Sequence, residues 1–96
     1  MRFIVLLNLV FLFFGFAYGQ TNDENMQLAN QYYKNKEYDK ANIIYEGLVK
    51  DKDIGRLIFS NYISSLYQQE DYKQALKVIN LMLKHFPSSV IYEVEL

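Results

Sequence analysis

The sequence predicts an all-α fold, and two observations lead to this prediction. From residue 22 onwards, apolar residues recur at steps of three and four positions, which places them on one face of a helix, and no stretch alternates as a half-buried strand does. In addition, the apolar pattern between positions 28 and 49 recurs between positions 62 and 83. We therefore expect four helices of about 12–15 residues, joined by short polar breaks that make neighbouring helices antiparallel.

Residues 1–19 differ from the rest of the chain. They hold 15 hydrophobic residues, five of the seven Phe and a single charge, that of Arg2. A basic start, an apolar run of about 14 residues, and the small residues Ala17 and Gly19 before Gln20 are typical of a cleaved secretory signal peptide. We expect residues 1–19 to be such a peptide. Two alternatives stay open: an uncleaved membrane anchor, which usually needs roughly 20 apolar residues, and a buried core helix.

Residues 20–96 have the composition of one small globular domain. They contain 9 Lys or Arg and 11 Asp or Glu residues. This near-neutral balance offers no basic surface for nucleic acid or for an anionic membrane. The chain has no Cys, which excludes disulfides, thiolate metal sites and cysteine nucleophiles.

Four apolar runs mark the predicted helices in chain order. Their apolar positions are Leu28, Ala29, Tyr32 and Tyr33; Tyr38, Ala41, Ile44, Tyr45, Leu48 and Val49; Ile58, Phe59, Tyr62, Ile63, Leu66 and Tyr67; and Tyr72, Ala75, Leu76, Ile79, Met82 and Leu83. Polar breaks are predicted at 35–37, 51–53, 69–71 and 87–88. Thr21, three positions before Glu24, has the form of a capping box. Ser88 or Ser89, after Pro87, is suited to cap a further helix.

Two halves of the chain align when Tyr33 is placed on Tyr67. In that register three further pairs become identical: Tyr38 and Tyr72, Ala41 and Ala75, Lys50 and Lys84. A 34-residue helix–turn–helix period is the signature of the tetratricopeptide repeat. The chain resembles that family through Leu28-Ala29-x-x-Tyr32, Tyr38, Ala41 and Tyr45 in one unit, and through Phe59, Leu66, Tyr72, Ala75, Ile79 and Pro87 in the next.

The resemblance implies two helical hairpins stacked in an α-solenoid. It divides the chain into a first unit at residues 22–55, a second at 56–89, and the start of a third at 90–96. Ala41 and Ala75 would lie where the helices of a pair cross, since a larger side chain would push the axes apart. A four-helix bundle is the alternative, although a bundle does not require the small residues to keep this register.

The end of the second unit lacks a predicted cover. A stacked repeat buries its apolar face only against its neighbours. We therefore expect several apolar side chains to face solvent: Leu81, Leu83, Phe86, Val90, Ile91 and Val94. Two explanations are open. The sequence is the amino-terminal piece of a longer repeat protein, or its uncapped carboxy-terminal end is buried by self-association.

Residues suited to catalysis or metal binding are scarce. His85 is the only histidine, and its place in the last turn of the fourth predicted helix favours a structural role. The sequence has no phosphate-binding loop, nucleophile elbow or metal-ligand spacing. We expect no enzymatic activity, no cofactor and no metal site.

The resemblance also implies a peptide-binding groove, because in the tetratricopeptide family the first helix of each pair lines a concave surface. The non-packing residues of these helices are Met26, Asn30, Tyr33 and Lys34 in the first unit, and Ser60, Asn61, Ser64, Tyr67 and Gln68 in the second. Amides and hydroxyls beside two stacked tyrosines suit an extended peptide. Some family members clamp a carboxylate terminus there with basic residues. Met26, Ile91 and Glu95 stand at those positions here, so we do not expect that mode of binding.

These observations predict a non-catalytic protein–protein interaction scaffold, exported to the periplasm or cell envelope. Its partner would be a protein or peptide segment, with neither nucleic acid nor, after signal cleavage, a membrane involved. One alternative is an amino-terminal accessory repeat domain of a longer exported enzyme or envelope-assembly protein. The other is a small helical protein that self-associates.

Cleavage before Gln20 can be tested by mass spectrometry. The secreted protein is expected to lack residues 1–19, because Ala17 and Gly19 provide the small side chains that a cleavage site requires. A Gly19→Phe variant should retain the leader. An intact wild-type mass that still includes residues 1–19 would contradict the prediction.

Overall fold

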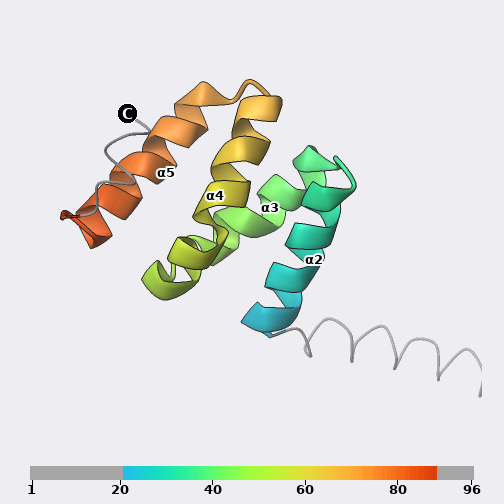
Figure 1. Cartoon of the computed structure of the whole chain (residues 1–96), viewed down its shortest axis with the longest axis horizontal. Helices are drawn as coiled ribbons and strands as arrows, with labels where there is room; N and C mark the ends of the chain where they lie inside the picture. The colour runs from blue at the N-terminus through green and yellow to red at the C-terminus, as the bar shows by residue number, and fades with distance from the viewer. Residues whose placement is uncertain (1–20, 89–96) are drawn as a thin grey trace, which may run out of the picture.

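The computed structural model describes residues 21–88, which form four α-helices and no strand (Figure 1). These helices are α2 (Asn22–Lys34), α3 (Tyr38–Leu48), α4 (Lys52–Gln68) and α5 (Tyr72–His85). The predicted all-α class is confirmed, although the helices run from 11 to 17 residues, a wider range than expected. The predicted signal peptide and the predicted start of a third unit lie outside the described residues.

Polar side chains cap the first turns of α2 and α4. The Thr21 hydroxyl accepts a hydrogen bond from the backbone N–H of Glu24 at 3.2 Å, as its spacing predicts. The Asp51 carboxylate accepts one from the backbone N–H of Asp53 at 2.9 Å, and α4 therefore begins at Lys52. Residues 52 and 53, which were expected in a break, instead form the first turn of α4. The predicted border between the first and second repeat units, after residue 55, consequently falls inside this helix.

The two helical hairpins close with the same turn. In each turn, two backbone N–H groups donate to carbonyl oxygens three and five positions earlier, which is the pattern of a Schellman motif. The bonds are Lys36 to Tyr33 (3.0 Å) and Glu37 to Tyr32 (2.8 Å) after α2, and Glu70 to Tyr67 (3.0 Å) and Asp71 to Leu66 (2.9 Å) after α4. The left-handed position is taken by Lys36 (φ 63°) and Glu70 (φ 57°) instead of Gly. The repeat is therefore present in backbone geometry as well as in sequence.

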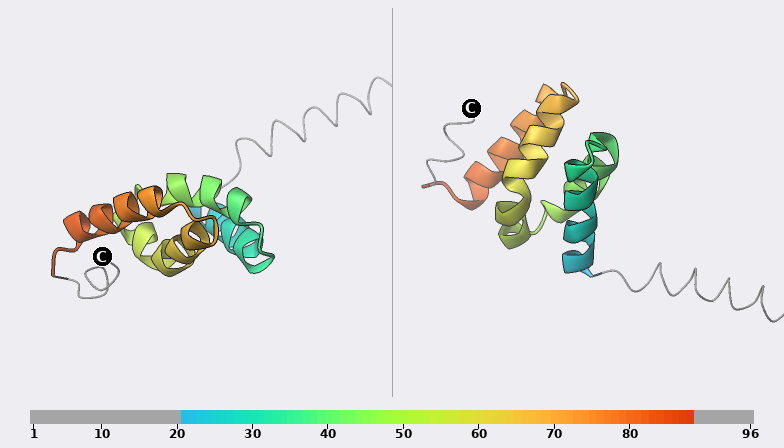
Figure 2. Two further views of the ribbon diagram at one scale, coloured as in Figure 1. Left: turned by 90° about the horizontal axis from the view of Figure 1, so that it is seen from above. Right: turned by 45° about the vertical axis from the view of Figure 1, so that its right-hand side comes forward.

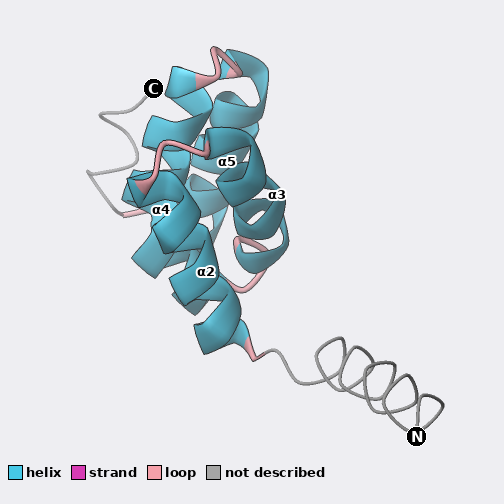
Figure 3. Ribbon diagram, turned by 90° about the vertical axis from the view of Figure 1, so that its right-hand side faces the viewer, coloured by secondary structure: helices cyan, strands magenta, loops and turns pink. Residues whose placement is uncertain are grey.

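The helices lie in two layers. Figures 2 and 3 show α2 and α4 on one side and α3 and α5 on the other. Helix α2 contacts α4, whereas no Cα atom of α5 lies within 8 Å of one in α2 or α3. The other helix contacts join helices that are consecutive in the chain. The described helices thus form an open series and not a bundle closed by its first and last members.

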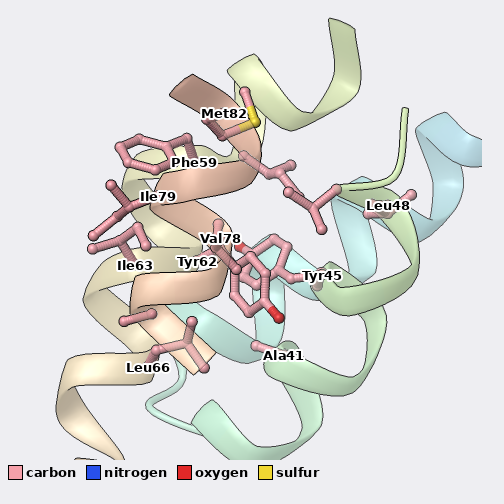
Figure 4. Close-up of a cluster of buried hydrophobic side chains, with 14 residues drawn as sticks. Ala41, Tyr45, Leu48, Phe59, Tyr62, Ile63, Leu66, Val78, Ile79 and Met82 are labelled. Atoms are coloured by element: carbon pink, nitrogen blue, oxygen red, sulfur yellow. The ribbon is translucent and has the colours of Figure 1, made fainter. Parts of the chain in front are cut away.

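The core lies between the two layers and joins the two hairpins. Tyr45 of α3 packs against Tyr62 of α4, with ring centroids 5.5 Å apart (Figure 4). Both tyrosines are buried, as are Ala41 and Ala75 at the positions predicted for the helix crossings. The remaining buried apolar residues are Ala29, Leu48, Val49, Ile58, Phe59, Ile63, Leu66, Val78, Ile79 and Met82.

The end of α5 is better covered than the sequence predicts. Leu81, Leu83 and Phe86 are partly buried against the core instead of lying open to solvent. Arg56 of α4 contributes to this cover, since its guanidinium lies 4.9 Å from the centre of the Phe86 ring. Val90, Ile91 and Val94, for which the same exposure was expected, are outside the described residues.

None of the helices between residues 22 and 85 combines the length and apolar character needed to cross a membrane.

Two helical glycines should respond in opposite ways to the same substitution. Gly47→Ala is expected to raise the free energy of unfolding by about 0.5–1 kcal/mol, because no atom lies within 4 Å of the added Cβ. Gly55→Ala should lower it by about 1 kcal/mol. Its Cβ would lie 3.1 Å from the Met82 sulfur and 3.2 Å from the Val49 carbonyl oxygen, which cannot rotate away. Urea unfolding followed by circular dichroism measures both changes. Equal gains at the two sites would show that Gly55 is not closely packed.

Candidate functional site

Four of the predicted groove residues meet where α2 lies beside α4. The Tyr33 hydroxyl of α2 donates to the Ser64 hydroxyl of α4 at 3.0 Å. The Asn61 side-chain amide of α4 donates to Asn30 Oδ1 of α2 at 3.3 Å. We call Asn30, Tyr33, Asn61 and Ser64 the α2–α4 seam. Each helix contributes two residues three positions apart, which a helix places on one face.

A fifth residue, Tyr45, reaches the seam from α3. Its hydroxyl donates to the same Asn30 Oδ1 that accepts from Asn61. The apolar spacing of α3 predicts a core position for Tyr45 but does not connect its hydroxyl to the groove. The sequence feature that could have indicated this contact is a Tyr at a core position, because a buried phenol hydroxyl needs a hydrogen-bond partner.

The Tyr45 hydroxyl is a donor at neutral pH, and burial extends this protonated form to higher pH. Removal from water raises the pKa of this hydroxyl above its ordinary value, and the neighbouring Asn61 amide offsets only part of that increase. Asn30 Oδ1 therefore accepts two hydrogen bonds at neutral pH, and the Asn30 side chain is held in a fixed orientation.

The two amides of the seam leave a donor group and an acceptor group for a ligand. Within residues 21–88, no hydrogen bond uses the Asn30 amide nitrogen or the Asn61 amide oxygen. Both residues are half-buried, one on each helix. A peptide backbone has the matching carbonyl and N–H groups, so these two side chains can bind it together.

The other predicted groove residues lie around the seam. Lys34, Ser60 and Gln68 are exposed, and Met26 is partly buried against the core. The tyrosines pack within their own hairpins and do not form the expected stacked pair. Tyr33 contacts Tyr38 at a ring distance of 5.8 Å, and Tyr67, which is 38% exposed, contacts Tyr72 at 5.9 Å.

Groups suited to metal binding do not converge in the part of the chain that the structure describes. No three His, Asp or Glu side chains between residues 21 and 88 are grouped as metal ligands. His85 lies in the last turn of α5, as expected, with its ring 6.4 Å from that of Phe86.

No family model, curated protein or solved structure matches the chain.

Removing the Tyr45 hydroxyl should weaken the seam. Tyr45→Phe is expected to lower the free energy of unfolding at pH 8 by about 0.5–1.5 kcal/mol, the usual net value of one hydrogen bond. The matched control is Tyr72→Phe, because the Tyr72 side chain is 61% exposed and outside the seam. Urea titrations of the two variants measure the difference, and equal stabilities would contradict the role of the hydroxyl.

The free energy of unfolding at alkaline pH should depend on the hydroxyl group of Tyr45 and on that of Tyr62. Burial raises the pKa of both, so the unfolded chain releases these protons first. Their contribution to stability is complete below about pH 10 and decreases as the pH rises through the folded-state pKa values. Between about pH 9 and about pH 11, the free energy of unfolding should decrease less in the Tyr45→Phe variant than in the wild type. Urea titrations across this range measure the loss, and an unchanged slope would contradict the assignment.

Proposed function

We propose that the protein is an exported, non-catalytic scaffold of the tetratricopeptide type, which binds an extended protein or peptide segment on the surface formed by α2 and α4. The main supporting observation is that one hairpin geometry occurs twice in succession, with the first helices of the two hairpins in contact at a polar seam. The leader at residues 1–19 supports export to the periplasm or cell envelope.

Several contacts support the repeat assignment. The Schellman turns after α2 and α4 have the same bonds, and the adjoining tyrosine pairs have nearly equal ring distances of 5.8 and 5.9 Å. The small residues Ala41 and Ala75 are both buried at equivalent places. The first helices approach each other more closely than the second helices do, as a curved stack of hairpins would require.

The chemistry of the seam supports a peptide as the ligand. Asn30 and Asn61 offer a donor and an acceptor from neighbouring helices at fixed positions. Lys34 and Gln68 add exposed polar groups beside them. A backbone in extended conformation presents alternating carbonyl and N–H groups, so it can bond to both amides without requiring a particular side chain.

A peptide library displayed on phage and selected against the protein tests this function. Ser60→Arg combined with Gln68→Arg should weaken binding of the selected peptides at least about tenfold, because bulky side chains on exposed positions of α4 would obstruct the surface beside the seam. The matched control is Ile43→Arg, which changes an exposed residue of α3 in the other layer.

The outcome is measured by fluorescence anisotropy and by the backbone amide signals that the peptides shift in NMR spectra. Shifts in α2 and α4 are expected. Peptides that bind equally well to the double variant, or that shift signals of α3 around Ile43, would contradict the proposed surface.

A further inference from the structure

Leu57 is the most exposed large apolar residue of α2 and α4, with an exposed fraction of 71%. A single apolar residue on a surface is common and needs no explanation. The position of this one is informative, because it precedes Asn61 and Ser64 of the seam at steps of four and three. A helix places residues at these steps on one face, so Leu57 continues the seam's stripe along α4.

Met26 continues the stripe of α2 in the same way, since it precedes Asn30 and Tyr33 at steps of four and three. Helices α2 and α4 run in the same direction, so both stripes continue toward the same end of the molecule (Figure 1). The two hydrogen bonds of the seam each join residues 31 positions apart, and the same offset pairs Met26 with Leu57. Met26 is partly buried against the core and leaves Leu57 open. The polar seam therefore has an apolar end.

The spacing along the seam matches the repeat of an extended peptide. Four residues of a helix rise about 6 Å, and two residues of an extended chain span about 6.6 Å. Side chains alternate along an extended chain, so residues two positions apart face the same way. A peptide that lies along the seam and bonds to the Asn30 and Asn61 amides therefore brings the side chain two positions away to Leu57.

The charges around this end do not select a charged side chain. Both signs occur near the starts of the two helices, with Asp23 and Glu24 on α2 and Lys52, Asp53 and Arg56 on α4. A charged group placed over Leu57 would lose contact with water, which is costly. An apolar side chain at the same place would remove apolar surface of both molecules from water, which is favourable.

We propose that Met26 and Leu57 form an apolar subsite at the end of the α2–α4 seam, which takes one aliphatic or aromatic side chain of the bound peptide. The inference rests on the proposed function, because the peptide must first lie on the α2–α4 surface. The seam amides bind a backbone of any sequence. Leu57 then determines specificity, because it adds a preference for an apolar residue at one position of the peptide.

Peptides selected from the phage library provide the probe, and they should share an apolar residue at one position. One selected peptide and a copy with Ala at that position are compared by fluorescence anisotropy. The copy should bind the wild-type protein at least about tenfold more weakly. It should bind the Leu57→Ala variant within about twofold of the selected peptide, because the partner of the apolar side chain is then missing.

Ile43→Ala is the matched control, because Ile43 is similarly apolar and 74% exposed but lies on α3. This variant should keep the tenfold difference between the two peptides. Circular dichroism verifies that each variant is folded. The variant with Ser60→Arg and Gln68→Arg separates the subsite from the function on which it rests, since it should weaken both peptides.

The subsite alone is refuted if peptides that the double arginine variant weakens share no apolar residue, or if Leu57→Ala keeps the tenfold difference. Failure to select any peptide, or binding that the double arginine variant leaves unchanged, would overturn the proposed function as well. Sedimentation that shows a wild-type dimer dissociated by Leu57→Ala would assign Leu57 to a second copy. Peptide binding that appears only when residues 89–96 are removed would assign Leu57 to the chain itself.

Discussion

The contact between Tyr45 and Tyr62 is the interaction on which the rest of the structure depends. The two buried rings lie 5.5 Å apart and join α3 to α4 across the boundary between the hairpins. The Tyr45 hydroxyl bonds to Asn30 of α2, and the Tyr62 hydroxyl accepts a hydrogen bond from Gln74 of α5 at 3.4 Å. One aromatic pair thereby links all four helices. Its rings supply apolar area to the core, and its hydroxyl groups satisfy polar partners at the helix surfaces.

Much of the fold follows from local rules that act within one helix or one turn. Apolar spacing predicted the helices, and Thr21 was correctly assigned as a cap because its partner Glu24 is only three positions away. The start of α4 was misplaced because a run of three charged residues at 51–53 resembles a break, whereas Asp51 acts as the cap. The turns at Lys36 and Glu70 were found from the polar breaks, but their left-handed conformation was not. Gly usually marks that conformation, whereas a Lys and a Glu adopt it here within the two Schellman turns.

The candidate site could be predicted only to the level of a helix face. Periodicity identified Asn30, Tyr33, Asn61 and Ser64 as members of the exposed faces of two helices. Their pairing depends on how far α2 is displaced along α4, which no local pattern determines. For the same reason the hydrogen bond of the Tyr45 hydroxyl could not be predicted, since its partner lies 15 positions away in a different helix. The seam consequently has fewer open polar groups than the sequence implies, and those that remain are more fixed in position.

The unequal contact within the two layers has a mechanical consequence. The α2–α4 layer is closed by close backbone approach and hydrogen bonds, whereas no Cα atom of α3 lies within 8 Å of one in α5. A change in the angle between the hairpins therefore has to act on two contacts, the polar α2–α4 seam and the apolar packing of α3 on α4 around Tyr45 and Tyr62. The hydrogen bonds of the seam are directional, whereas apolar packing is not. A small sliding movement of α3 against α4 should therefore cost less free energy than separation of α2 from α4.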